Sequence, residues 1–380
     1  MIYFDNAATT FPKPQSVINS VNECIKEYCG NPGRGSHSLA RRAAEGVFET
    51  REKIATLLGT KAPENVVFTY NATYAINLAL KTLIKENCHV ITSDIEHNAV
   101  IRPLEKLKRT VGISYSIFDS DGDIQRNIEK LIQKDTACIV STLSSNVTGK
   151  PIPLKILSDI SIRYGLKLIV DASQYIGYKE IDLTETPCDV LCAPGHKSLY
   201  GIQGCGFMLL GDSVLPKPIL EGGNGINSLD WAMPDLSPER FETGTLPTPC
   251  IAGLSEGISY LSKFTPEEIA THEIALFDRL KYMLMNSTEL KAKIYLPEAR
   301  GAVMLFNMDG ISSETVGRHL SERGICVRSG YHCSALGHKA LGTDEIGAVR
   351  VSFGIFNTLN DTEILIRALK ELRESTKADK

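Results

Sequence analysis

The stretch LKLIVDASQYIGYKEIDLTETPCDVLCAPGHKSLYG, residues 166–201, carries the pattern that decides the fold. It contains two short apolar runs, 166–171 and 189–193, each followed at once by polar residues and glycine. Short runs rich in apolar and β-branched residues, bounded by turn residues, are typical of buried strands. We therefore predict two strands here, each with polar side chains at its carboxyl end.

The same pattern extends from about residue 60 to residue 210. Further predicted strands are 66–70, 89–93, 113–118, 137–143 and 205–210. Helical stretches separate several of them, and the segment 73–86 places apolar residues on one helical face. Strands alternating with helices predict an α/β layer with a mostly parallel sheet. Such sheets bind ligands beyond the carboxyl ends of their strands.

The pattern changes from about residue 260 onward. We predict helices at 266–286, 312–322 and 361–374, with strands at 293–296, 302–307 and 325–328. This arrangement indicates a second, smaller α+β domain. The predicted division is a large domain of residues 16–258 and a small C-terminal domain that combines 1–15 with 259–380.

Composition and charge exclude several classes of function. The chain has 380 residues, 41 of them basic and 45 acidic, without a long run of either sign. This balance argues against nucleic acid or an anionic membrane as a partner. No apolar run reaches the roughly 20 residues of a membrane helix, and residues 1–15 do not resemble a secretory signal. The ten cysteines contain no CxxC pair, so we expect reduced thiols in a cytoplasmic protein.

Three of the predicted strands end in residues suited to ligand binding. Ala72 and Thr73 open the helix after 66–70, where backbone N–H groups attract phosphate, although Thr73 could act simply as an N-cap. His97, after 89–93, could stack on a planar ligand or bond locally. Asn146 follows the strand at 137–143.

Asp171 and Lys197 follow the two strands of the stretch quoted first. In pyridoxal phosphate enzymes a lysine forms a Schiff base with the cofactor, and a carboxylate keeps the pyridine nitrogen protonated. The alternative is that Lys197 is a solvated surface lysine. Gly195, Gly201 and the neighbouring His196 weaken that alternative, because they indicate close backbone packing.

Taken together, these motifs resemble the class V aminotransferase-fold family of pyridoxal phosphate enzymes, and within it the cysteine desulfurase and selenocysteine lyase group. The resemblance runs through nearly the whole chain, from YFDNAATT (3–10) to RVSFGIFNT (350–358). Its motifs between are EHN (96–98), SNVTG (145–149), DASQ (171–174), GHKSLYG (195–201), ETGTLPT (242–248) and VRSGYHC (327–333). It implies the fold-type I architecture. The RSGYHC form is similar to the group with a short catalytic loop, in a less characterised branch.

The resemblance implies a set of residues that bind pyridoxal 5'-phosphate: Ala72, Thr73, His97, Asn146, Asp171, Gln174, His196, Lys197 and Thr245. Lys197 would bind the cofactor covalently and move the Cα proton, and Asp171 would pair with the pyridinium nitrogen. Gln174 would bond the ring hydroxyl, while His97 would stack on the ring. Thr245 would reach the phosphate in the partner subunit of a homodimer.

The resemblance also implies how a small substrate, L-cysteine or an analogue, would bind and react. Arg350 would clamp the α-carboxylate, supported by Asn146, with His332 and Arg328 nearby. Cys333 would attack the substrate sulfur. We expect the cations around Cys333, including those from His332, His338, Lys339 and Arg328, to raise its thiolate fraction. Cys333 could instead be a buried, inert thiol, or a metal ligand together with His332 and His338, although three ligands make a poor metal site.

The leading hypothesis is therefore a cysteine desulfurase that forms alanine and a persulfide on Cys333, which a sulfur-acceptor protein would then collect. The alternatives are a selenocysteine lyase, another pyridoxal phosphate-dependent C–S lyase or transaminase, and a non-catalytic sulfur-relay scaffold. Fold alone does not separate these reactions. Pro194 departs from the family pattern, because close relatives often place a phosphate-binding serine there.

Overall fold

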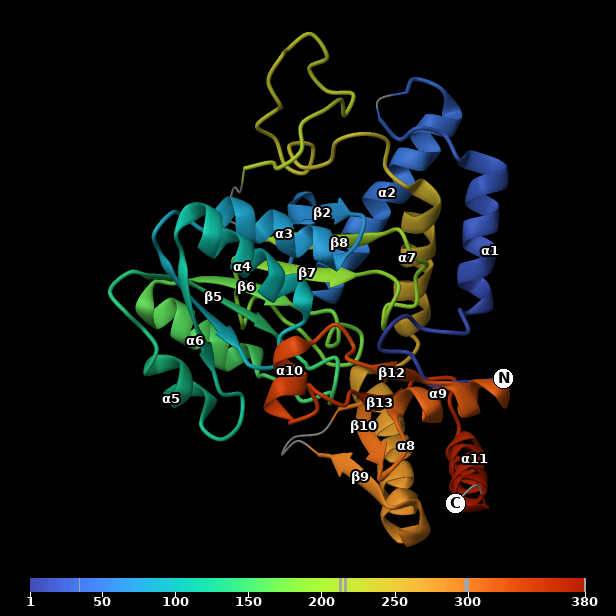
Figure 1. The fold of residues 1–380 in the computed structure, drawn as a ribbon. Coiled ribbons are helices and arrows are strands. Elements are labelled where there is room, and N and C mark those ends of the chain that lie inside the picture. Colours follow the sequence, from blue (N-terminus) through green and yellow to red (C-terminus); the bar gives the residue numbers. More distant parts are fainter. Residues whose placement is uncertain (34, 212–213, 215–216, 297–300, 379–380) are drawn as a thin grey trace.

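A seven-stranded sheet forms the centre of the computed structural model, which describes residues 1–33, 35–211, 214, 217–296 and 301–378 (Figure 1). Its strand order is β2-β8-β7-β6-β5-β3-β4. The strands are β2 (Val66–Thr69), β3 (His89–Ser93), β4 (Ser114–Phe118), β5 (Thr136–Thr142), β6 (Lys167–Asp171), β7 (Val190–Pro194) and β8 (Gly206–Leu210). Strands β4, β3, β5, β6 and β7 run parallel, and β8 is antiparallel to both its neighbours.

Helices cover both faces of this sheet, because successive side chains of each strand point to opposite sides. On β7, Val190 and Cys192 join the apolar core beneath α3 (Ala72–Leu83) and α4 (Asn98–Val111). Leu191 and Ala193 join the core of the other face. That face is covered by α2 (Ser38–Leu57), α6 (Leu154–Tyr164) and α7 (Thr248–Leu261), with α1 (Gln15–Glu23) packed on α7. The short α5 (Ile124–Glu129) precedes β5.

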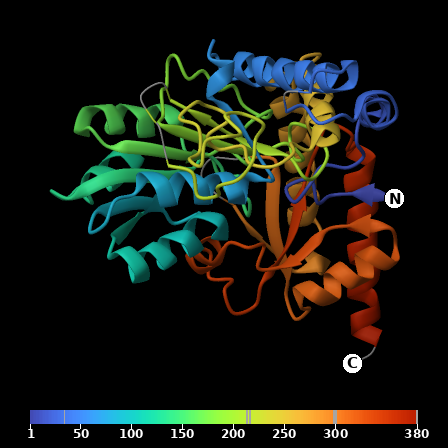
Figure 2. The same ribbon diagram turned by 90° about the horizontal axis from the view of Figure 1, so that it is seen from above.

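A second core is built by the C-terminal elements around a four-stranded sheet, in the order β12-β13-β10-β9. Its strands are β9 (Ala292–Tyr295), β10 (Val303–Met308), β12 (Arg328–Gly330) and β13 (Ala348–Ser352). Its helices are α8 (Pro266–Asn286), α9 (Ser313–Glu322), α10 (Ala335–Ala340) and α11 (Leu359–Ala378). The N-terminal β1 (Ile2–Tyr3) pairs with β11 (Ile325–Cys326). Figure 2 shows these orange and red elements gathered at one side of the large sheet.

The predicted fold class, an α/β layer with a mostly parallel sheet and a smaller α+β part, is confirmed. Two details of the prediction were wrong. The run 325–328 divides into β11 and β12, and several elements were not predicted, namely β1, α1, α2, α7, β13 and α10. The domain division at residues 15 and 258 stays a prediction. None of the helices in the described ranges combines the length and apolar character that a membrane span requires.

Candidate functional site

A cavity of about 190 Å³ lies at the carboxyl ends of β3, β5, β6 and β7. It collects side chains predicted from seven separate segments of the sequence. The predicted site residues in its lining are Ala72, Thr73, His97, Asn146, Asp171, Gln174, His196, Lys197, Arg328, His332 and Arg350. Two predicted residues, Cys333 and Thr245, are not part of the lining.

One end of the cavity is the N-terminus of α3. The N-cap is Asn71, whose Oδ1 accepts a hydrogen bond from the Tyr74 amide at 2.9 Å. The alternative that Thr73 caps this helix is therefore wrong. Ala72 and Thr73 occupy the first helical positions, where backbone N–H groups have no acceptor within the helix and favour an anion.

Lys197 and Asp171 meet because β6 and β7 are parallel neighbours. Burial lowers the pKa of Lys197 to about 8, with Asp171 opposing the shift and Arg350 reinforcing it. Asp171 is buried, and its Oδ1 accepts from the Ser173 amide at 2.9 Å. Lys197 lines the cavity rather than the outer surface. It therefore keeps a fraction of neutral amine near neutral pH, as a nucleophilic or proton-accepting lysine requires.

The N-terminal segment holds the backbone of this lysine loop, a feature that the sequence reasoning did not identify. The Lys13 Nζ donates to the His196 carbonyl at 2.9 Å, and Thr10 Oγ1 donates to the Lys197 carbonyl at 3.0 Å. Gln174 Nε2 donates to the Ala7 carbonyl at 2.8 Å. The quoted motif YFDNAATT contains two of these residues, but their partners lie far away along the chain.

Arg350 is buried in the cavity lining, on β13. Its Nη2 donates to Asp5 Oδ1 at 2.6 Å and its Nη1 to the Asn146 carbonyl at 2.9 Å. Asp5 thus orients the guanidinium and offsets part of its charge. The interaction between these two residues, which are 345 positions apart, could not be predicted from local sequence.

Three buried polar atoms in the cavity lining have no partner among the described residues: Arg350 Nε, Asn146 Oδ1 and His196 Nδ1. Buried polar groups are normally paired, so each indicates a ligand group of complementary chemistry. Together with a helix N-terminus, a carboxylate and a lysine of lowered pKa, this donor set fits a ligand with a phosphate, an aldehyde and an aromatic ring nitrogen, which describes pyridoxal 5'-phosphate.

His97 forms the N-cap of α4, and its Nδ1 accepts from the Ala99 amide at 3.0 Å. Burial lowers the pKa of His97 to about 4, so the ring is neutral. The adjacent Glu96 is fully buried, and burial raises its pKa to about 8. Its Oε1 accepts from the Thr142 amide at 2.8 Å, which ties the His97 turn to β5. Glu96 belongs to the quoted EHN motif, but its role was not predicted.

Cys333 lies beside the cavity rather than in its lining. The thiol is exposed, and Arg328 Nη2 donates to its Sγ at 3.6 Å. Arg328 does line the cavity, so the thiol is in contact with a residue of the cavity lining. An exposed thiol beside a guanidinium contrasts with buried thiols such as Cys192, whose pKa burial raises well above the ordinary value. The expectation that this thiol could be buried is therefore wrong, and its reactivity stays a prediction.

Burial disfavours the charged form of both histidines near Cys333. Burial lowers the pKa of His332 to about 3, aided by Arg350, and burial also lowers the pKa of His338. The expectation that their positive charge favours the thiolate is therefore wrong, and Arg328 is the cation in contact with the sulfur. As to the metal alternative, the described residues contain no group of three or more His, Cys, Asp and Glu arranged to hold an ion.

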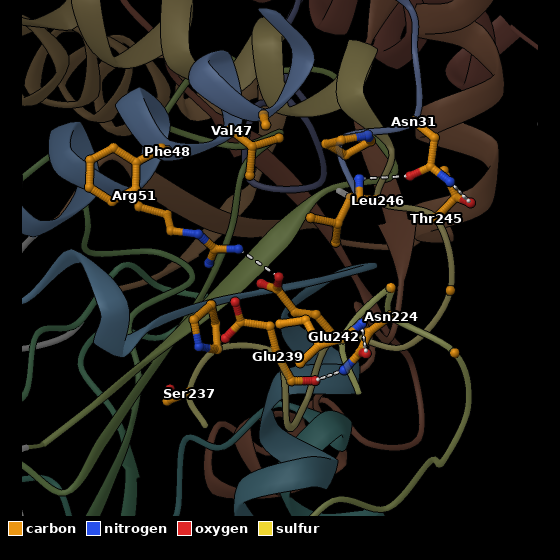
Figure 3. A pocket seen from close by; sticks show the side chains of 18 of the residues that line it. Asn31, Val47, Phe48, Arg51, Asn224, Ser237, Glu239, Glu242, Thr245 and Leu246 are labelled. Atoms are coloured by element: carbon orange, nitrogen blue, oxygen red, sulfur yellow. Dashed lines mark hydrogen bonds and ion pairs between the residues drawn. The ribbon is translucent and has the colours of Figure 1, made fainter. Parts of the chain in front are cut away.

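Thr245 lines a different cavity of about 630 Å³, drawn in Figure 3. Its Oγ1 accepts from Asn31 Nδ2 at 3.4 Å, and a buried Arg51–Glu242 ion pair of 2.6 Å lies in the same lining. Within one chain, Thr245 is therefore separate from the cavity that holds Lys197. Its predicted role in a partner subunit stays a prediction.

The chain was compared with known proteins. Residues 2–365 match the family profile of class V aminotransferases. A probable cysteine desulfurase of Halalkalibacterium halodurans is 31% identical, with 98% of this chain and 93% of the relative covered. A probable cysteine desulfurase of Pyrococcus abyssi is 30% identical over 100% of this chain and 96% of the relative. The apo cysteine desulfurase of Thermococcus onnurineus superimposes with a TM-score of 0.91 at 29% identity, covering 98% and 95% of the two chains.

Proposed function

The chain belongs to the class V aminotransferase family, and from this premise we propose that it is a cysteine desulfurase dependent on pyridoxal 5'-phosphate. It would convert L-cysteine to L-alanine and leave the sulfur as a persulfide on Cys333. The observation that carries the proposal is that a lysine, a carboxylate and a carboxylate-binding arginine share one cavity, with an exposed thiol beside it. A simple transaminase does not need that thiol.

Pyridoxal phosphate, when bound, would draw electron density from the substrate Cα, which allows the Cα–H and C–S bonds to break. Ala72, Thr73 and His196 would hold its phosphate, and Asp171 its ring nitrogen. His97 would stack on the ring and Gln174 would bond the ring hydroxyl. Pro194 also lines the cavity and offers no hydroxyl for the phosphate.

Lys197 and Cys333 would carry out the two steps that protein side chains perform, proton transfer and nucleophilic attack. Lys197, neutral in part because of its lowered pKa, takes the proton from the substrate Cα and returns one to the product. The Cys333 thiolate, in contact with Arg328, attacks the substrate sulfur. The S–S bond forms as the C–S bond breaks, and the electron pair of the broken bond ends on carbon, which takes up a proton to become the methyl group of alanine.

The proposed function is tested by comparing substrates. Alanine formation is measured from L-cysteine, L-selenocysteine and cysteine sulfinate with the same enzyme preparation. We expect cysteine to be turned over with sulfur retained on the protein. Turnover of selenocysteine alone would instead establish a lyase for that amino acid, and no alanine from any of the three would contradict the proposal.

Arg350→Ala is expected to weaken substrate binding while leaving the cofactor in place. Loss of a charged partner by a buried carboxylate typically costs about 2–5 kcal/mol, so we expect the KM for cysteine to rise by at least roughly 30-fold. The visible spectrum of the bound cofactor is expected to be unchanged. Arg350→Lys is the matched control, since it keeps the charge but not the bidentate geometry. A wild-type KM in Arg350→Ala would remove Arg350 from this role.

We also propose a homodimer in which Thr245 of each subunit completes the other subunit's phosphate site. It is supported by the position of Thr245, which lies away from the cavity in its own chain. Sedimentation is expected to give twice the chain mass, and Thr245→Val to weaken cofactor retention without dissociating the dimer. A monomer that retains both cofactor and activity would contradict this.

The exposure of Cys333 and the state of the cysteines support two further parts of the proposal, a sulfur-acceptor protein and a cellular location. The thiol is exposed, so a persulfide on it would be within reach of an acceptor protein. All ten cysteines are free thiols. Free thiols support a reducing, cytoplasmic location, and we include this location in the proposal.

A further inference from the structure

The turn that carries Cys333 has an unusual backbone conformation. It joins β12 to α10, and φ is +52° at His332 and +55° at Cys333. Residues other than glycine rarely adopt this left-handed region, at a cost on the order of 1 kcal/mol each. Two such residues in succession persist only where the surrounding structure holds them.

A chain of side-chain hydrogen bonds runs behind this turn. His332 Nε2 lies 3.3 Å from the Arg328 carbonyl, and His332 Nδ1 lies 3.0 Å from His338 Nε2. His338 Nδ1 lies 2.7 Å from Thr343 Oγ1. The chain therefore links the start of β12 to the residues beyond α10, and it passes through the residue just before Cys333.

The proton positions along this chain follow from the Arg328 carbonyl, which is the acceptor at one of its ends. A carbonyl oxygen only accepts, so His332 must carry its proton on Nε2. A neutral His332 then accepts at Nδ1, which requires the His338 proton on Nε2. His338 Nδ1 in turn accepts from the Thr343 hydroxyl, whose oxygen lies 2.7 Å from Nδ1 and farther, at 3.3 Å, from its other acceptor, the His338 carbonyl. Both rings are buried, at 3% and 1% exposure, which favours the neutral forms that this assignment needs.

Three further hydrogen bonds hold the same turn, two through its carbonyl groups and one through the Ser334 side chain. Asn146 Nδ2 donates to the His332 carbonyl at 2.8 Å, and the Asn98 amide donates to the Cys333 carbonyl at 2.8 Å. Ser334 Oγ donates to the Glu96 carbonyl at 3.1 Å. These bonds hold the turn through its carbonyl groups and through the buried Ser334 side chain, whereas the histidine chain holds the His332 side chain in the cavity lining.

We propose that His338 is a positioning residue for sulfur transfer, acting through His332 to hold the Cys333 thiol beside Arg328. This inference rests on the proposed function. It implies that the thiol does not swing out to deliver sulfur, and that the acceptor must reach it where it stands. His338 does not line the cavity, so it acts only through its neighbour.

The test compares His338→Leu with His338→Gln in the cofactor-loaded enzyme. Leucine removes the donor to His332, whereas the glutamine Nε2 can replace it. We expect His338→Leu to slow single-turnover addition of sulfur to Cys333 by roughly 10- to 100-fold, as small displacements of a reacting group do, with the KM for cysteine unchanged. His338→Gln is expected to recover most of that rate.

The matched control is His89→Leu, which removes another buried histidine with hydrogen bonds to both ring nitrogens, at the opposite end of β3. It is expected to lower the melting temperature but to leave sulfur addition at the wild-type rate. Sulfur addition at the wild-type rate in His338→Leu, or no recovery in His338→Gln, would overturn the inference.

Two measurements separate this inference from the proposed function. Nitrogen-15 NMR of the wild-type histidines should find His332 and His338 both protonated at Nε2, and a proton on Nδ1 of either ring would overturn the inference. Hydrogen exchange over residues 328–343 should be faster in His338→Leu than in wild type and in His338→Gln; equal rates would also overturn it. Absence of sulfur on wild-type Cys333 would instead refute the proposed function.

Discussion

Lys197→Ala is expected to lose alanine formation altogether and to release its cofactor on gel filtration. The reason is that Lys197 is the lysine in the cavity lining, at the end of β7 beside Asp171. No second amine lines that cavity among the described residues, so covalent attachment and Cα proton transfer are lost together. General acid–base catalysis alone contributes about 10²–10⁴-fold, and the loss of cofactor adds to this. The measurements are alanine release from cysteine and the absorbance of the desalted protein.

Lys197→Arg is the control for charge, because a guanidinium keeps the positive charge near Asp171 but is neither nucleophilic nor readily deprotonated. It should be as inactive as Lys197→Ala while retaining the stability of the wild-type fold. Alanine formation by either variant within about tenfold of the wild-type rate would place the proton transfer elsewhere, since the loss would fall below the range of one catalytic acid–base group.

Cys333→Ala is expected to bind the cofactor and cysteine normally and yet to fail in sulfur transfer. The cavity lining is untouched by this change, since Cys333 is not part of it. No substitute thiol lines the cavity among the described residues, and thiols such as Cys138 and Cys205 are buried, with burial raising the pKa of each. Removal of the nucleophile is expected to cost at least about 10³-fold in alanine formation.

Cys326→Ala is the matched control for Cys333→Ala, because Cys326 lies on β11, one strand before the same turn, and has no proposed role. It should desulfurate cysteine at the wild-type rate. If Cys333→Ala also kept that rate, the enzyme would expel its leaving group without covalent assistance, and Cys333 would be a spectator.

The sequence predicted the large sheet well, because its buried strands are continuous apolar runs separated by turn residues. Asp171 and Lys197 could be placed together for the same reason, since both follow parallel strands. Strand β13 was missed although its motif was recognised. It is five residues long, it carries a buried arginine, and its partners β10 and β12 are set by tertiary packing.

The charge state of the site was the part least accessible from sequence. His332 and His338 near a cysteine suggested cations, but burial lowers the pKa of both, and their rings are hydrogen-bonded to each other. Two other features of the site join segments that lie far apart along the chain. They are the ion pair between Asp5 and Arg350 and the hydrogen bond from Lys13 to the His196 carbonyl. Local periodicity carries no information about such contacts.

The most direct test of the central claim is to locate the transferred sulfur. Wild-type enzyme loaded with cofactor is treated with L-cysteine, trapped with an alkylating agent, digested and analysed by mass spectrometry across all ten cysteines. We predict one additional sulfur on Cys333 and none on the other nine, together with one alanine for each sulfur retained. Alanine release with no sulfur on Cys333, or with sulfur on a different cysteine, would contradict it.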